Sequence, residues 1–234
     1  MSDVATYEVR RGEIETYFDR TASDAWKKLT SDAPLGRIRT SVRAGRDEMR
    51  GFLSSLLPVD LSGARVLDAG CGTGALSIAL AQRGAEVVAI DLSPTLVAHA
   101  AELAAAAGVA GQISFSAGDM LAASHGRFDH VVLMDSLIHY EPADAAAALT
   151  TLAARTTGSI AFTIAPKTPM LTVMHRLGRL FPRGDRAPAI VPVATDRFGE
   201  RLESHPGLAG WQIASERRVL SGFYKSHGME LVRS

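Results

Sequence analysis

The sequence contains a single cysteine, Cys71, among 234 residues. This excludes an intrachain disulfide and a zinc site built mainly from cysteine thiolates. The formal net charge is zero because 25 basic residues balance 25 acidic ones, which argues against a nucleic-acid groove over much of the surface. No run of 18 uncharged apolar residues is present, so the sequence predicts no membrane-spanning helix.

The N-terminal segment is polar and lacks the apolar stretch of a secretory signal. We therefore expect a cytoplasmic protein that contacts a membrane at most at its surface. Hydrophobic residues make up 47% of the chain and charged residues 21%, which is the composition of a folded globular protein. The length suits one α/β domain with a modest extension.

Residues 1–57 are rich in charged helix formers and show no strand alternation. They predict an N-terminal helical cap or lid, with helices over residues 10–18, 23–28 and 37–57. Pro58 ends the last of these helices.

From Ala64 onward, short apolar strands alternate with helices, which is typical of a mostly parallel sheet with helices on both faces. We predict a Rossmann-like α/β domain with a mostly parallel seven-stranded sheet over residues 58–234, with an insertion or lid at about 166–192. The predicted strands are residues 65–68, 86–91, 113–116, 130–134 and 159–164, and a closing antiparallel pair at 211–219 and 222–232. The predicted helices are residues 74–82, 94–107, 143–154 and 196–204, with a short one near 170–180.

A glycine-rich segment, Asp68-Ala-Gly70-Cys-Gly72-Thr-Gly74, follows the first predicted strand and opens a helix. Glycines let the backbone turn sharply and approach a ligand, and the helix N-terminus offers N–H groups to an anion. Asp91 ends the next strand, where a carboxylate can accept ribose hydroxyls. The same arrangement fits a dinucleotide, because Gly70-x-Gly72-x-x-Ala75 meets the relaxed fingerprint of dinucleotide-binding folds.

Three features favour S-adenosylmethionine over a dinucleotide. Asp68 would face the ammonium group of a methionine moiety, whereas it would repel a pyrophosphate. Gly74 adds a third glycine at a spacing of two. Gly118-Asp119-Met120 follows the third predicted strand, where an acid can accept the adenine amino group and a methionine can cover the ring.

In order and spacing, these segments resemble the nucleotide-binding motifs of class I S-adenosylmethionine-dependent methyltransferases. We expect Cys71 to be a small buried loop residue, because no histidine or lysine adjoins it in sequence. The predicted methyl-donor site consists of Asp68, Gly70, Cys71, Gly72, Thr73, Gly74, Asp91, Leu92, Gly118, Asp119, Met120 and Met134.

Further blocks of sequence span nearly the whole chain. They are Tyr17-Phe-Asp-Arg-Thr-Ala22 with Trp26, Leu29-Thr-Ser-Asp32 before Arg37-Ile-Arg39, Val42-Arg-x-Gly45-Arg-Asp-x-Met49, Met134-Asp-Ser-Leu-Ile-His139-Tyr140, Phe162-Thr-Ile-Ala-Pro166, Leu180-Phe-Pro-Arg183-x-Asp-Arg186-Ala-Pro188 and Ser221-Gly-Phe-Tyr224. In these blocks the chain resembles the magnesium-protoporphyrin O-methyltransferases of chlorophyll and bacteriochlorophyll biosynthesis.

The resemblance implies transfer of a methyl group from S-adenosylmethionine to one propionate carboxylate of magnesium protoporphyrin IX, with release of S-adenosylhomocysteine. It also implies contact with the porphyrin-binding large subunit of magnesium chelatase, and a peripheral location at the photosynthetic membrane. Two alternatives stay open. One is an O-methyltransferase for another small acid or phenol, and the other is a non-catalytic tetrapyrrole carrier with the same fold.

The chemistry of a carboxylate acceptor predicts which kinds of residue the site needs. A carboxyl group has a pKa of about 4 and is already an oxygen nucleophile at neutral pH, so we expect orienting residues and not a proton relay. His139, just after the fourth predicted strand, is predicted to orient the propionate, with Tyr140 beside it. Tyr17, on an N-terminal helix folded over the donor, is the second catalytic candidate.

The acceptor site is also expected to use basic and aromatic side chains. Arg183 and Arg186, next to Phe181, would offer guanidinium groups to carboxylates and an aromatic ring to the macrocycle. Arg39 begins a basic helix stripe that continues at positions 43, 46 and 50. That stripe fits a second propionate, a protein partner or an anionic membrane surface, and equally a solvated face. The histidines show no metal-ligand spacing, so magnesium is expected to arrive only inside the porphyrin.

Overall fold

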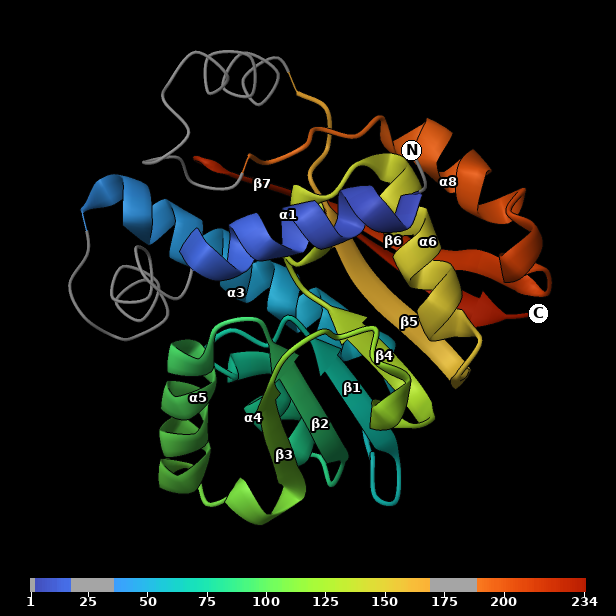
Figure 1. The fold of residues 1–234 in the computed structure, drawn as a ribbon. Coiled ribbons are helices and arrows are strands. Elements are labelled where there is room, and N and C mark those ends of the chain that lie inside the picture. Colours follow the sequence, from blue (N-terminus) through green and yellow to red (C-terminus); the bar gives the residue numbers. More distant parts are fainter. Residues whose placement is uncertain (1–2, 18–35, 169–188) are drawn as a thin grey trace.

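A seven-stranded sheet with the strand order β3-β2-β1-β4-β5-β7-β6 forms the centre of the molecule (Figure 1). The structure is a computed structural model, and it describes residues 3–17, 36–168 and 189–234. The strands are β1 (Arg65–Ala69), β2 (Glu86–Asp91), β3 (Ile113–Ala117), β4 (Phe128–Leu133), β5 (Thr156–Ile164), β6 (Trp211–Ser221) and β7 (Tyr224–Arg233). The first five pair in parallel, while β7 pairs antiparallel with both β5 and β6.

The strand order reverses between β1 and β4, which lie side by side in the middle of the sheet. In doubly wound folds, the chain leaves two such neighbouring strands toward opposite faces of the sheet. A crevice therefore opens beyond the carboxyl ends of the two strands. This topology therefore places the functional site next to the glycine-rich loop after β1 and the segment after β4.

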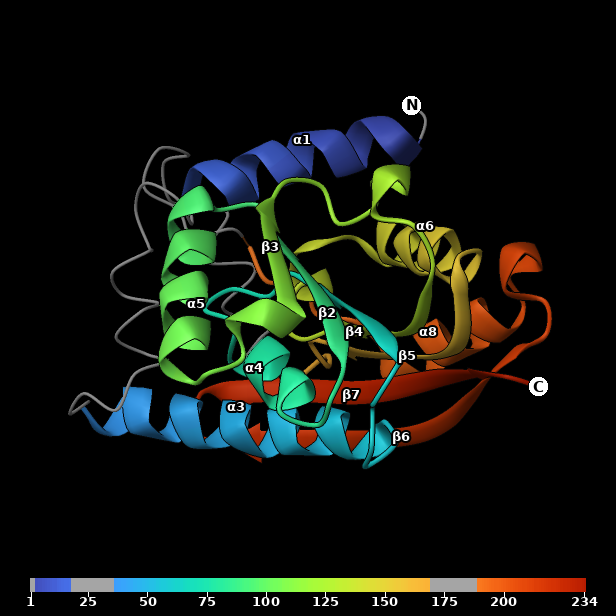
Figure 2. The same cartoon turned by 90° about the horizontal axis from the view of Figure 1, so that it is seen from below.

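Helices cover both faces of the sheet, and Figure 2 shows the two layers on either side of it. α3 (Arg37–Leu56) packs along β6 and β7, and α4 (Ala75–Ala81) packs on β1 and β2. On the other face, α6 (Pro142–Ala153) packs on β5 and α8 (Thr195–Glu203) on β6. α5 (Pro94–Ala106) packs against β2 and β3 on the same face as α4, and its Ala104 belongs to the same buried cluster as Leu76 and Leu80 of α4. Short 3-10 helices are η2 (Ala110–Gln112), η3 (Ala123–His125), η4 (Leu137–His139) and η6 (Pro206–Leu208).

Each face of the sheet has its own buried apolar cluster. One joins the sheet to α3 and α4 and includes the fully buried Met49 and Leu53. The other joins it to α6 and α8, and in it Phe162 of β5 meets the ring of Phe198 edge-on at 6.4 Å between centroids. Burial on both faces explains why the central strands are nearly continuous apolar runs without alternation.

The N-terminal helix α1 (Asp3–Tyr17) crosses the molecule above the first strands of the sheet (Figure 1). Thr6 Oγ1 donates a hydrogen bond of 2.8 Å to Asp144 Oδ1 of α6, and Ile14 is buried in the cluster on that side. α1 therefore lies over the carboxyl edge of the sheet, whereas α3 forms part of the helix layer on one face.

The predicted fold class is confirmed, and most element bounds agree within three residues. The Ser93 cap of α5 is present, because its Oγ accepts a hydrogen bond of 3.2 Å from Leu96 N. The start of the first helix was predicted wrongly, at residue 10 instead of Asp3, because its first two turns are supported by packing on α6 and not by local apolar periodicity. The helices predicted at 23–28 and 170–180 lie outside the described residues.

Candidate active site

The glycine-rich loop turns the chain from β1 into α4 through three left-handed residues. Gly70, Gly72 and Gly74 have φ of 83°, 55° and 77°, a region that side chains with a Cβ rarely adopt. Gly70 is also needed for space, because a Cβ there would lie 2.6 Å from Ser136 Oγ. That hydroxyl donates to Ala69 O at 2.6 Å, so the loop is held against the segment that follows β4.

Two acidic side chains flank this loop. Asp68 is fully buried at the end of β1 and accepts a hydrogen bond of 2.6 Å from Ser77 Oγ of α4. Burial, with a further contribution from the charge of Asp91, raises the pKa of Asp68 to about 7. Asp91 at the end of β2 accepts from Gly72 N at 2.8 Å and from Ser93 N at 3.0 Å, and burial raises its pKa as well.

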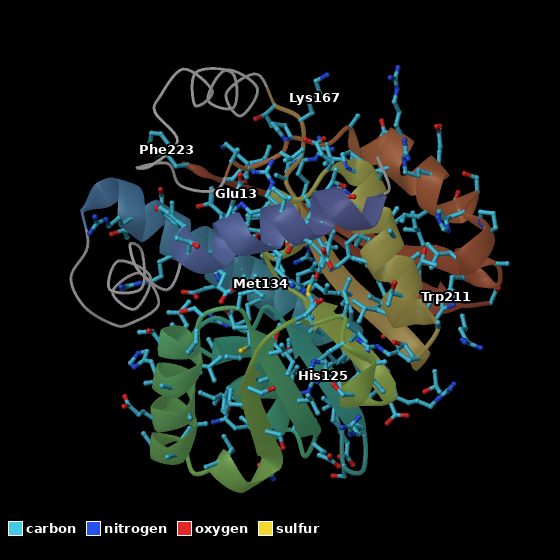
Figure 3. All side chains as sticks on the ribbon, in the orientation of Figure 1. Glu13, His125, Met134, Lys167, Trp211 and Phe223 are labelled. Carbon is cyan, nitrogen blue, oxygen red and sulfur yellow. The ribbon has the colours of Figure 1, made fainter. Side chains whose placement is uncertain are left out.

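A cavity of about 360 Å³ lies beyond these residues, within the size range of small-molecule sites. Of the twelve predicted donor-site residues, all line it except Gly74 and Asp119. Figure 3 labels two of the lining residues. Met134 lies near the centre of the molecule below α1, and Phe223 lies at the edge of the molecule. A glycine-lined backbone turn between two carboxylates, facing a cavity of this size, fits a nucleoside with a methionine moiety. Cys71 lies in the wall with a pKa raised by burial, so its thiol stays protonated and unreactive.

Asp119 is bound to the N-terminal helix. Its Oδ1 accepts from Tyr7 OH at 2.9 Å and its Oδ2 from an Arg11 guanidinium N–H at 2.7 Å. Both carboxylate oxygens therefore have partners within the protein, while its neighbours Gly118 and Met120 line the cavity. Tyr7 and Arg11 did not emerge from the sequence, because no local pattern connects a residue of α1 with one more than a hundred positions away.

The acceptor-site candidates after β4 lie in the cavity wall. His139 is buried and its Nδ1 lies 3.5 Å from the carbonyl oxygen of Ala189. Tyr140 stacks on Tyr7 with ring centroids 5.0 Å apart. Burial raises the pKa of Tyr140 to about 12, so this phenol is neutral and can donate a hydrogen bond.

Two further candidates, Tyr17 and Arg39, lie away from the cavity wall. Tyr17 is the last residue of α1 and is absent from the lining, to which the same helix contributes Tyr7 and Ile14. Arg39 is exposed on α3 and does not line the cavity. The expected contributions of Phe181, Arg183 and Arg186 fall outside the described residues.

A largely buried ion pair in the cavity wall was not predicted from the sequence. Arg46 Nη1 of α3 binds Asp135 Oδ2, just beyond β4, and Tyr224 OH donates to Asp135 Oδ1 at 3.0 Å. Asp135 has φ of 58° without being glycine, a strained conformation that clusters at functional sites. Arg46 belongs to the predicted basic stripe. Asp135 and Tyr224 belong to the sequence blocks that carry the family resemblance, but only the fold brings the three residues together.

Within the described ranges, no group of three or more His, Cys, Asp or Glu residues is arranged to hold a metal ion. Among the same residues, no helix is long and apolar enough to cross a membrane.

The sheet order, the glycine-rich loop after β1 and the acid at the end of β2 define a class I S-adenosylmethionine-dependent methyltransferase fold. Residues 66–157 match a general methyltransferase domain, and residues 133–233 match the family described as magnesium-protoporphyrin IX methyltransferase C-terminus. The chain is 46% identical to magnesium-protoporphyrin O-methyltransferase of Rhodobacter capsulatus over 94% of this chain and 95% of that protein. It therefore belongs to the magnesium-protoporphyrin O-methyltransferase family.

Two further relatives agree with this assignment. The chloroplastic magnesium protoporphyrin IX methyltransferase of Arabidopsis thaliana is 32% identical over 94% of this chain and 70% of that one. The crystal structure of magnesium protoporphyrin IX methyltransferase from Synechocystis with bound SAH superposes with a TM-score of 0.79 at 32% identity. That comparison covers 94% of this chain and 98% of the other.

Proposed function

We propose that this protein transfers a methyl group from S-adenosylmethionine to a propionate carboxylate of magnesium protoporphyrin IX, giving the monomethyl ester and S-adenosylhomocysteine. The observation that carries the proposal is one cavity that joins the glycine-rich loop after β1 to His139 and Tyr140 after β4. Membership of the family supports the choice of acceptor.

Asp68, Gly70 and Gly72, Asp91 and Met120 would hold the methyl donor. S-adenosylmethionine supplies a sulfonium methyl group that a carboxylate oxygen can take without any proton transfer. The protein therefore has to position the acceptor oxygen and exclude water. Positioning accounts for much of the rate of such reactions, and a dry site favours a step in which an anion and a cation give neutral products.

His139 and Tyr140 are proposed to orient the acceptor. Both are buried in the cavity wall beyond β4, and a neutral Tyr140 hydroxyl can donate to a carboxylate. Tyr17 remains a proposed positioning residue at the end of α1, and Arg39, Phe181, Arg183 and Arg186 remain proposed contacts of the porphyrin. For these five the support is the family resemblance of their sequence blocks.

The test is to mix the purified protein with S-adenosylmethionine and magnesium protoporphyrin IX and to follow the monomethyl ester by mass spectrometry. Tight porphyrin binding without ester would support the carrier alternative. Absence of both porphyrin binding and ester formation would refute the proposal. Ester formation on another small acid or phenol, with none on the porphyrin, would favour the second alternative.

Variants at His139 test its role more finely. We expect His139→Ala to lower turnover strongly while the affinity for S-adenosylhomocysteine, measured by calorimetry, changes little. His99→Ala is the matched control, because His99 lies on α5 outside the cavity lining and pairs with Glu102 at 3.5 Å. Unchanged turnover of His139→Ala would remove this side chain from the active site.

We further propose contact with the porphyrin-binding large subunit of magnesium chelatase, and peripheral attachment to the photosynthetic membrane from a cytoplasmic location. The support is the family resemblance, together with the cost of exposing a large apolar macrocycle to water during its delivery. Co-sedimentation with the chelatase subunit and, separately, with vesicles of photosynthetic lipids tests the two contacts. Absence of binding in either experiment removes that contact.

A further inference from the structure

The strongest unexplained feature of the molecule is the ion pair of Arg46 and Asp135. The Arg46 side chain is 16% exposed and that of Asp135 is 5% exposed, and both line the cavity. A buried ion pair is weak evidence of stabilisation, because desolvation of the two charges offsets their attraction. Charged side chains placed in a cavity wall instead of in the apolar core therefore point to a ligand.

The pair lies next to the methyl-donor loop. Asp135 follows β4 by two residues, and its neighbour Ser136 donates to Ala69 O and would touch a Cβ at Gly70. The Asp135 backbone N–H donates to Thr163 Oγ1 at 2.7 Å. The ion pair thus stands at the junction of β1, β4 and β5, where acceptor and donor have to meet.

Tyr224 holds the carboxylate that pairs with Arg46. Tyr224 OH donates to both carboxylate oxygens of Asp135, at 3.0 and 3.3 Å, and burial and the charge of Asp135 raise the pKa of Tyr224, so it stays a donor. α3 approaches Tyr224 closely because residue 45 is glycine, where a Cβ would lie 2.6 Å from Tyr224 Cδ1. Asp135 thus holds the guanidinium of Arg46, and Tyr224 holds Asp135.

We propose that Arg46 is the receptor for the acceptor carboxylate that becomes methylated, and that Asp135 and Tyr224 are its positioning residues. This inference rests on the proposed function. A guanidinium carries five N–H donors in a planar fork, so it can bind a second carboxylate while it stays paired with the first. Because Asp135 already neutralises Arg46, the incoming carboxylate keeps its negative charge for attack on the sulfonium methyl group.

Among the described residues of the wall, Arg50 and Lys225 also carry a positive charge, and they fit this role less well. Arg50 lies one helical turn further along α3 and pairs at 2.8 Å with Asp47, whose side chain is 49% exposed. Lys225 offers a compact ammonium and no planar fork. Neither is fixed by the segment that follows β4.

The test compares three ligands with S-adenosylhomocysteine bound, so that no turnover occurs. They are magnesium protoporphyrin IX, its monomethyl ester and its dimethyl ester, and their dissociation constants are measured by the shift of the porphyrin absorption band. In the unmodified protein we expect the monoester to bind about tenfold more weakly than the diacid, because it lacks one charged hydrogen-bonding partner. In Arg46→Met, the ratio of the dissociation constant of the monoester to that of the diacid should fall to about one.

Further variants separate recognition from folding. The double variant Arg46→Met with Asp135→Asn leaves no unpaired buried charge and should show the same loss of the ratio. Arg46→Lys should keep part of it. Tyr224→Phe, which removes only the hydroxyl that holds Asp135, should lower the ratio at little cost in melting temperature. Arg201→Met is the matched control, because Arg201 is exposed on α8 outside the cavity lining, and it should keep the full ratio.

Each other outcome overturns the assignment. A ratio that Arg46→Met leaves unchanged would mean that Arg46 is structural. If the substitution removes only the difference between monoester and diester, Arg46 binds the propionate that does not react. Turnover of the unmodified protein is measured alongside, since its absence would overturn the proposed function itself and not only the role of Arg46.

Discussion

The pH dependence of donor binding offers a direct test of Asp68. The pKa of this carboxyl is raised to about 7 by burial and by the charge of Asp91. If the ionised form alone pairs with the ammonium group of the ligand, binding has to remove the proton. The affinity should then rise as the pH rises and reach its plateau above the pKa of Asp68.

The magnitude follows from the titration of one group. About nine in ten Asp68 carboxyls are protonated at pH 6 and about one in ten at pH 8, so the dissociation constant of S-adenosylhomocysteine should be about tenfold higher at pH 6 than at pH 8. Binding at pH 7 should release about half a proton. Calorimetry in two buffers that differ in ionisation enthalpy measures both quantities without any acceptor present.

Asp68→Asn should bind more weakly and show a flat profile. A dissociation constant that stays constant from pH 6 to pH 8, or a slope that survives in Asp68→Asn, would refute the reasoning. The unliganded protein provides an independent check on the sign. The folded state holds a proton that the unfolded chain releases near pH 4, so the contribution of Asp68 to stability should fall as the pH rises from about 4 to about 7.

Two further predictions concern packing, one in α3 and one in the sheet. Gly51→Ala should stabilise the protein by about 1 kcal/mol through helix propensity, because a Cβ there meets nothing within 4 Å. Gly45→Ala, in the same helix, should instead destabilise the protein, because a Cβ 2.6 Å from Tyr224 Cδ1 adds an overpacking cost of about 1–3 kcal/mol. Equal effects of Gly51→Ala and Gly45→Ala on the free energy of unfolding in urea would contradict this prediction. Phe162→Ala should cost about 3–5 kcal/mol because the ring is fully buried, whereas Phe223→Ala, at a side chain that is 51% exposed, should change the free energy of unfolding by under about 0.5 kcal/mol. A small loss for Phe162→Ala would mean that the core closes over the gap.

Local requirements of the backbone explain which features could be predicted from the sequence. The turn after β1 needs left-handed φ values, which require glycine, and it follows an apolar strand at a recognisable spacing. A buried parallel strand needs a short apolar run, and a helix that begins at Pro94 needs a cap at Ser93. Such features lie within a few consecutive residues, so the succession of strands, the donor loop and both flanking acids could be read directly from the sequence.

Contacts between distant segments could not be read in this way. Arg46, Asp135 and Tyr224 come from α3, the end of β4 and the start of β7, and they meet because α3 packs along β7 (Figure 2). Tyr7 reaches Asp119 only because α1 crosses the carboxyl edge of the sheet. No periodicity or spacing encodes these distances, since they depend on how whole layers pack, and packing is a property of the folded chain. The proposed donor site thus consists of one loop and two strand ends, whereas the wall proposed to face the acceptor is formed by tertiary packing.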